Sequence, residues 1–282
     1  MGEDTARSNP ERRHLGRLMM HSLRCVSLLM FLAGGLQAAC AGAWTLDRGQ
    51  WQMISGTTIS RASRGFDAAG QASDKVVFNK LFVQNSLEYG LTDAVTLFVA
   101  PEYVTVQSAT KGQAPTRSQD TAVEAGARIL LLTRIGMFSI QGSAKTAGAF
   151  DMSVSVHEDS ARQAELRLLY GRNYKFFRCD GFADLQVSQR WISRPRPNEI
   201  TVDATVGLWL APRTLAMLQS FNTVSSGAGK APYTFYRMHK LQLSVVRRIT
   251  RRWSLQLGVF ASPAGRNVVA EQGLATAFWY RI

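Results

Sequence analysis

Apolar and polar residues alternate strictly along most of the chain from about residue 50 to its end. In the segment 200–210, apolar residues occupy every second position, and threonine, aspartate and glycine occupy most positions between them. The segments 121–133, 164–170 and 253–261 repeat this pattern. Successive side chains of a β-strand point to opposite faces, so the alternation predicts strands with one apolar face.

Twelve such segments predict an all-β chain. Most have room for the roughly 9–11 residues with which a tilted strand crosses a bilayer. They recur about every 20 residues, a wider spacing than the 8–12 residues typical of a soluble β-sandwich. The predicted strands cover residues 50–61, 76–90, 94–107, 120–133, 137–149, 162–174, 181–193, 199–211, 214–224, 233–248, 252–262 and 269–282.

The connections between these segments alternate in length. The short ones are 90–93, 134–136, 176–180, 211–213 and 249–251, and the longer ones are 62–75, 108–119, 150–161, 194–198, 225–232 and 263–268. Short periplasmic turns that alternate with long external loops are typical of outer-membrane barrels. The pattern therefore predicts a closed antiparallel transmembrane β-barrel of about twelve strands, with both ends of the barrel domain on the periplasmic side.

Aromatic residues end several apolar faces beside the short turns. They are Tyr89, Phe138, Tyr170, Trp253 and Tyr280. Such positions are typical of an interfacial girdle, although strands are rich in aromatic residues in general.

An apolar run at residues 25–36 follows Arg24 and precedes small residues that end in Ala41-Gly-Ala43. This arrangement predicts a secretory signal peptide over residues 1–43 and a barrel over residues 44–282. The polar stretch before the run is long, so we expect translation to start at Met19 or Met20 and residues 1–18 to lie upstream of the true start. Export to the outer membrane makes nucleic-acid binding an unexpected role for this basic chain.

Composition narrows the classes further. The 282 residues carry a formal net charge of +13, with 46% hydrophobic and 19% charged residues. These values are not those of a disordered chain. The three cysteines, Cys25, Cys40 and Cys179, form no CxxC motif or Cys/His cluster, so we expect no zinc site.

The last predicted strand ends with Phe278, Tyr280 and Ile282 on one face. In this the chain resembles Gram-negative outer-membrane β-barrel proteins of the porin-like or transporter type. Their final strand carries aromatic residues at alternate positions and usually ends in phenylalanine, where this chain has Ile282. The Trp44-Thr-Leu start of the expected mature chain and the turn 90–93 are also similar to such barrels. The resemblance implies that the barrel-assembly machinery reads the last strand, and that outer-membrane lipid and lipopolysaccharide surround the protein.

If the apolar faces contact lipid, the opposite faces line the barrel, because charges on the lipid side are costly at mid-depth. This places six acidic and six basic residues in the lumen, together with several glutamines. The charged residues are Lys80, Glu88, Glu102, Glu124, Arg128, Lys145, Glu165, Arg167, Asp184, Arg190, Asp203 and Lys240. The register of the segment 214–222, which contains Gln219 and Asn222, stays open.

Two interpretations of this lumen remain open. In one, twelve strands leave a narrow wet pore with opposing charges across it. In the other, the charges pair and side chains fill the interior. For a pore, the residues expected to contact anions are Arg128, Arg167, Arg190 and Lys240; Glu124, Glu165 and Asp184 oppose them, and Lys80, Lys145 and Asp203 are further candidates.

A second group of basic residues lies beside the predicted short turns. It consists of Arg134, Arg172, Lys175, Arg178, Arg213, Arg247, Arg248, Arg251 and Arg252. This basic ring either attracts anionic solutes to the mouth or contacts anionic lipid headgroups.

Candidate catalytic residues are few. The segment 157–160 combines His, Glu, Asp and Ser in a predicted loop, where neighbours along an extended chain rarely converge, and His239 lies within a strand. The sequence contains no EF-hand, P-loop or HExxH motif. We therefore expect no cofactor and no metal.

The sequence thus favours a non-enzymatic, porin-like channel for passive diffusion of small polar or anionic solutes. One alternative is a barrel enzyme that modifies lipid or lipopolysaccharide, whose activity His157→Ala would abolish. Another is a closed structural or adhesive barrel that acts through its loops and conducts no ions. The third alternative is a soluble periplasmic β-sandwich. Carbonate extraction would release such a protein and would leave a barrel in the membrane.

Overall fold

The computed structural model describes residues 42–110, 114–147, 161–231 and 233–282. These residues form strands and connections, and none of them belongs to a helix able to cross a membrane. The strands are β1 Trp51–Phe66, β2 Ala72–Thr92, β3 Val95–Thr110, β4 Thr116–Leu132, β5 Met137–Lys145, β6 Gln163–Phe176, β7 Cys179–Ile192, β8 Glu199–Ala211, β9 Thr214–Ser225, β10 Arg237–Arg248, β11 Trp253–Arg266, β12 Val268–Val269 and β13 Gln272–Arg281.

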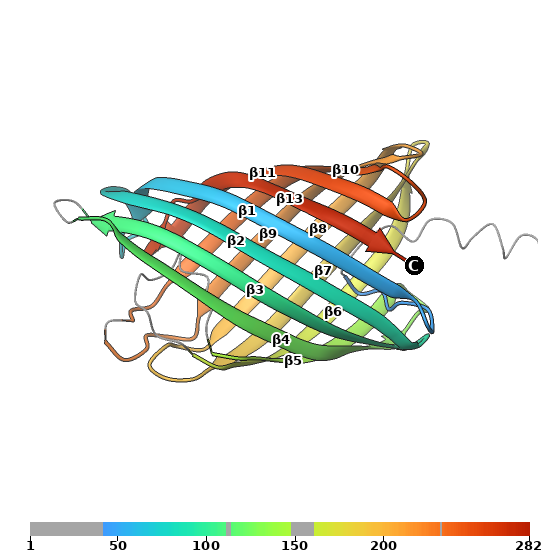
Figure 1. Cartoon of the computed structure of the whole chain (residues 1–282), viewed down its shortest axis with the longest axis horizontal. Coiled ribbons are helices and arrows are strands. Elements are labelled where there is room, and N and C mark those ends of the chain that lie inside the picture. Colours follow the sequence, from blue (N-terminus) through green and yellow to red (C-terminus); the bar gives the residue numbers. More distant parts are fainter. Residues whose placement is uncertain (1–41, 111–113, 148–160, 232) are drawn as a thin grey trace, which may run out of the picture. The chain divides into compact units, whose positions relative to one another are not determined.

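Twelve long strands close into one antiparallel barrel (Figure 1). β1 pairs with both β2 and β13, which joins the two edges of the sheet. The short β12 pairs with the end of β1 at Gly65 and Phe66. A closed wall satisfies its backbone hydrogen bonds without water, as a membrane-spanning sheet must. The prediction of an all-β, closed barrel of about twelve strands is confirmed.

Several strands extend further than predicted at the end of the barrel that carries the long connections, here called the long-loop end. At the same end β5 stops at Lys145 instead of residue 149, and β10 starts at Arg237 instead of residue 233. β1 runs to Phe66 and β2 starts at Ala72, so the connection expected at 62–75 shrinks to 67–71. Likewise β11 continues to Arg266 through the connection expected at 263–268. Polar residues continue the pairing there, because a strand beyond the apolar band no longer needs an apolar face. The opposite end is called the short-turn end.

The outer face of the barrel is apolar, as the alternation predicted. Along β8, Ile200, Val206 and Leu210 point outward and are 44%, 48% and 58% exposed. Along β11, Leu257 and Val259 do the same. A continuous apolar surface of this kind is stable only against an apolar surrounding.

Aromatic rings gather on this outer face near the short turns. Trp51 stacks on Tyr89, with ring centroids 4.4 Å apart, and Trp253 lies 4.0 Å from Tyr280. Rings with one polar atom favour the interface between membrane and water. The arrangement agrees with the expected girdle.

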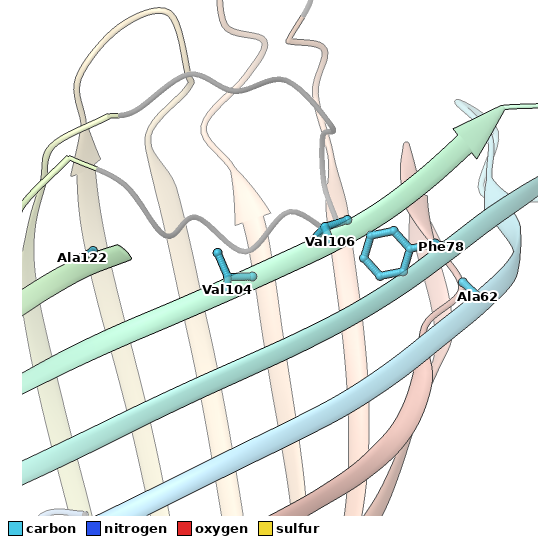
Figure 2. Close-up of a cluster of buried hydrophobic side chains, with 5 residues drawn as sticks. All are labelled: Ala62, Phe78, Val104, Val106 and Ala122. Carbon is cyan, nitrogen blue, oxygen red and sulfur yellow. The ribbon is translucent and has the colours of Figure 1, made fainter. Parts of the chain in front are cut away.

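Part of the inner face is also apolar, near the long-loop end (Figure 2). This inner cluster consists of Ala62, Phe78, Val104, Val106 and Ala122. In β3 the two valines are buried inside, whereas Tyr103 and Thr105 between and beside them are only partly buried. The general expectation that apolar residues face lipid is therefore wrong for this part of β3, where both faces carry apolar groups.

Candidate functional site: the barrel lumen

A cavity of about 590 Å³ lies inside the barrel and is lined by residues of β1 through β11. Its wall combines charged, amide and aromatic side chains. Nine of the ten candidate residues lie at this wall: Lys80, Glu124, Arg128, Lys145, Glu165, Arg167, Arg190, Asp203 and Lys240. The tenth, Asp184, is buried near the short-turn end, beside the chain segment that precedes β1.

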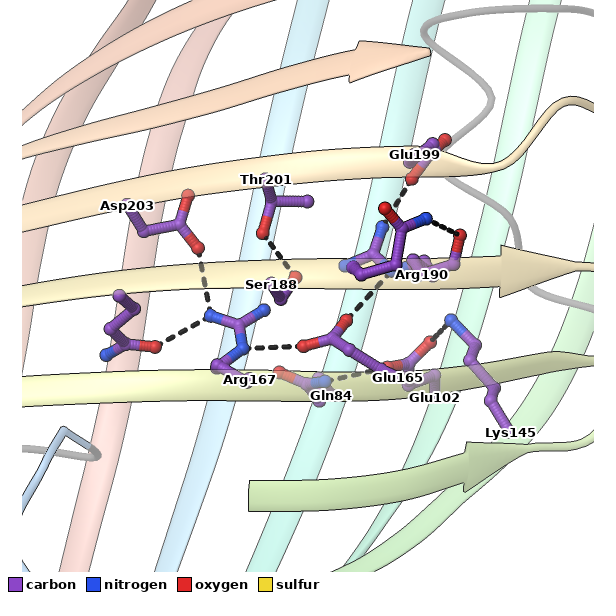
Figure 3. A network of polar contacts seen from close by, with 12 residues as sticks. Gln84, Glu102, Lys145, Glu165, Arg167, Ser188, Arg190, Glu199, Thr201 and Asp203 are labelled. Atoms are coloured by element: carbon purple, nitrogen blue, oxygen red, sulfur yellow. Dashed lines mark hydrogen bonds and ion pairs between the residues drawn. The ribbon is translucent and has the colours of Figure 1, made fainter. Parts of the chain in front are cut away.

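Arginines and carboxylates form a chain of ion pairs across β6, β7 and β8 (Figure 3). Arg167 contacts Glu165 at 2.5 Å and Asp203 at 3.0 Å. Arg190 contacts the second oxygen of Glu165 at 2.9 Å and Glu199 at 2.7 Å. Because every second side chain of a strand points to the same face, these residues share the inner face of adjacent strands, and each guanidinium reaches carboxylates on either side.

Two further pairs lie on β2 to β5. Lys145 forms an ion pair with Glu102, which also accepts a hydrogen bond from the Gln84 amide at 2.7 Å. Arg128 lies 3.4 Å from Glu88, and both side chains are buried. These lumenal bases are thus each neutralised by a nearby carboxylate, in most cases on another strand.

Glu271 joins strands on both sides of the seam where β1 meets β13. The side chain is 0% exposed and contacts the ammonium of Lys80 at 2.7 Å and that of Lys240 at 3.0 Å. It also accepts a hydrogen bond from the Ser60 hydroxyl. Lys240 in turn lies 4.9 Å from the centre of the Phe260 ring.

Residues 42–47, called the strap, lie inside the barrel at the short-turn end. The Ala43 N–H donates to Asp184 at 2.9 Å, and the Ser139 hydroxyl donates to the Ala43 carbonyl at 2.5 Å. Arg128 donates to the Trp44 carbonyl at 3.0 Å. Through these bonds the strap is joined to β4, β5 and β7: it donates one hydrogen bond and accepts two.

Apolar packing adds to these bonds. The Trp44 ring meets the edge of Phe182, with centroids 5.9 Å apart, and Leu46 is buried with its N–H on the Thr96 hydroxyl. Gly171 makes room for the strap, since a Cβ there would lie 2.6 Å from the Trp44 ring. The strap narrows this mouth of the lumen.

The predicted anion contacts therefore all lie in the lumen, and each of them is bonded to a carboxylate in this structure. Their role in binding anions stays a prediction. Glu124 differs from the other carboxylates: among the described residues, it makes no hydrogen bond or ion pair. In the open segment 214–222, Gln219 faces inward and bonds the Gln242 amide, whereas Asn222 bonds His239.

Three parts of the site were not predicted from the sequence: Glu199, Glu271 and the strap. Glu199 is the first residue of the predicted strand 199–211, and Glu271 is the third residue of the predicted strand 269–282 and directly precedes β13. Both lie just outside the clearest alternating runs, 200–210 and 272–282. The strap has no periodicity, and residues 42 and 43 were assigned to the signal peptide. Their position near the end of a predicted strand was the only sequence feature that could have indicated a lumenal role for the two glutamates.

Other predicted features lie at the barrel ends or outside the described residues. Arg248 of the basic ring lies 5.0 Å from the centre of the Trp209 ring, and Lys175 lies 3.7 Å from Asp180. The segment 157–160 and residues 1–41 of the predicted signal peptide fall outside the described residues.

A closed barrel with an apolar outer face, aromatic rings near one end and a charged interior defines the class of outer-membrane β-barrels. Solved structures of this class share the fold. The chain is similar to the COG4313 outer membrane channel from Pseudomonas putida F1, with a TM-score of 0.67 and 12% identity over 87% of this chain and 100% of that one. The translocator domain of the autotransporter NalP from Neisseria meningitidis gives a TM-score of 0.55 and 11% identity over 95% and 98% of the two chains.

A comparison with protein-family models and one with curated proteins found no match. At such low identity the structural likeness shows a common fold, and the function has to be argued from the lumen itself.

Proposed function

We propose that the protein is an outer-membrane channel through which small polar solutes diffuse passively. The observation that carries this proposal is the 590 Å³ cavity within a closed wall, lined by charged and amide side chains. Such groups replace part of the hydration of a polar solute, whereas an apolar filling would exclude it. The short-turn end faces the periplasm.

Conductance tests this function. We expect the full barrel, refolded and inserted into a planar bilayer in KCl, to give discrete current steps of small amplitude, because the lumen is narrowed by the strap and by paired side chains. Heat modifiability on an SDS gel checks that the barrel is folded. A folded barrel that gives no steps at any voltage would exclude the channel.

A closed structural barrel that acts through its loops is the second candidate. The observation that favours it is the local pairing of the lumenal charges together with the strap across one mouth. It predicts a folded protein without conductance, so the same experiment separates the two candidates.

A further inference from the structure

The inner wall carries more acidic than basic residues. To the six acids and six bases predicted from the sequence, the structure adds Glu199 and Glu271, which are 5% and 0% exposed and bond lumenal bases. Arg196 is buried as well, but it lies in the connection between β7 and β8, over the Tyr233 ring. The acids therefore outnumber the bases.

Each of the six bases predicted for the lumen has a carboxylate partner. Arg167 and Arg190 have two each, Lys80 and Lys240 share Glu271, and the two others have one each. An anion that enters the lumen has to displace a carboxylate from a charge-assisted contact, and the displaced carboxylate loses its partner. The bases are thus poor contacts for a passing anion.

Glu124 is the carboxylate that remains available. It lies halfway along β4, is half-buried, and lines the cavity. The register pairs it with Lys145 of β5, but the Lys145 ammonium contacts Glu102 instead. One inward position further along β4 is Gly126, where a Cβ would lie 2.7 Å from the Phe98 ring. Phe98 and Glu124 thus line the same cavity, and an aromatic face and a carboxylate each favour a cation over an anion.

We infer that the lumen prefers cations over anions and that Glu124 determines this preference. The solutes that fit are small monovalent cations and small molecules that carry an ammonium group. The inference rests on the proposed channel function and names the class of solute for the same lumen. Apart from the partly buried Arg248, the basic ring at the short-turn mouth is exposed, so salt screens its field within roughly 10 Å.

Reversal potentials in a KCl gradient test the inference. The native barrel is expected to pass K⁺ in preference to Cl⁻. Glu124→Gln is expected to lower the ratio of K⁺ to Cl⁻ permeability roughly fivefold, the factor that one unit charge at about 4 Å exerts in water. Since the Glu124 side chain makes no hydrogen bond or ion pair among the described residues, the variant is expected to keep the wall intact, and heat modifiability checks its folding.

Two control variants accompany it. Asp180→Asn removes one negative charge at a short turn, outside the lumen, and is expected to leave the permeability ratio unchanged. Glu124→Asp keeps the charge and is expected to keep the cation preference. A native preference for chloride, or an unchanged ratio in Glu124→Gln, overturns the inference and leaves the channel in place. A folded native barrel without current steps overturns both the inference and the channel.

Discussion

Replacing Glu271 by leucine is expected to lower the free energy of unfolding of the barrel by about 3–5 kcal/mol, the usual cost of removing one partner from a buried ion pair. The substitution leaves the ammonium groups of Lys80 and Lys240 without the carboxylate that they share, at a position that is 0% exposed. Equilibrium unfolding by urea in lipid vesicles, followed by tryptophan fluorescence, measures the loss.

A triple variant separates the lost ion pairs from lost packing. With Lys80→Met and Lys240→Met added to Glu271→Leu, no buried charge is left alone, so most of the stability is expected to return. If Glu271→Leu is as stable as the native protein, water reaches the two lysines and the buried ion-pair cluster is not what stabilises this part of the wall.

Substituting valine for Gly171 is expected to raise the single-channel conductance severalfold. A Cβ at this position lies 2.6 Å from the Trp44 ring and 3.0 Å from Ala43, so the strap has to leave its place against β6. Once displaced, the strap loses its bonds to Asp184 and Ser139, and the short-turn mouth widens. Current amplitudes in planar bilayers, compared at one voltage and salt concentration, give the result.

Gly142→Val is the matched control for this change. Gly142 lies on the adjacent strand β5, and a Cβ there meets no atom within 4 Å, so conductance should stay at the native value. Equal conductance in Gly171→Val and the native barrel would mean that the strap does not limit the current, and a narrower point elsewhere in the lumen would have to be sought.

The alternating pattern was sufficient to predict the barrel. The two-residue alternation is a local property, and a wall between lipid and a polar interior imposes it on every strand. Residues as far apart as Val123 and Leu257 could therefore be assigned to the outer face without knowledge of their neighbours. The same rule placed Arg167 and Glu165 in the lumen. Polarity alone does not mark Val104 and Val106 as inward, although they follow Glu102 on the same face of β3, because the inner cluster near the long-loop end is apolar.

The ion-pair partners of the lumenal side chains could not be predicted from the alternating pattern. Which carboxylate Lys145 contacts depends on strand tilt and on the reach of a flexible side chain, and the residue directly opposite it, Glu124, is not the one it contacts. The strap was missed for a related reason. Its position is determined by tertiary contacts to Arg128 and Asp184, and no local periodicity marks a segment of this kind.

The position of Glu271 bears on the route by which a solute would leave the proposed channel. A lateral opening of this barrel would separate β1 from β13, the strands that close the sheet. Glu271 accepts a hydrogen bond from Ser60 on one side of this seam and forms an ion pair with Lys240 on the other. If the seam opened at the long-loop end, these buried charges would be exposed to the hydrocarbon of the membrane. In the proposed channel, lateral escape of a solute into the bilayer is therefore disfavoured, and a solute leaves along the barrel axis.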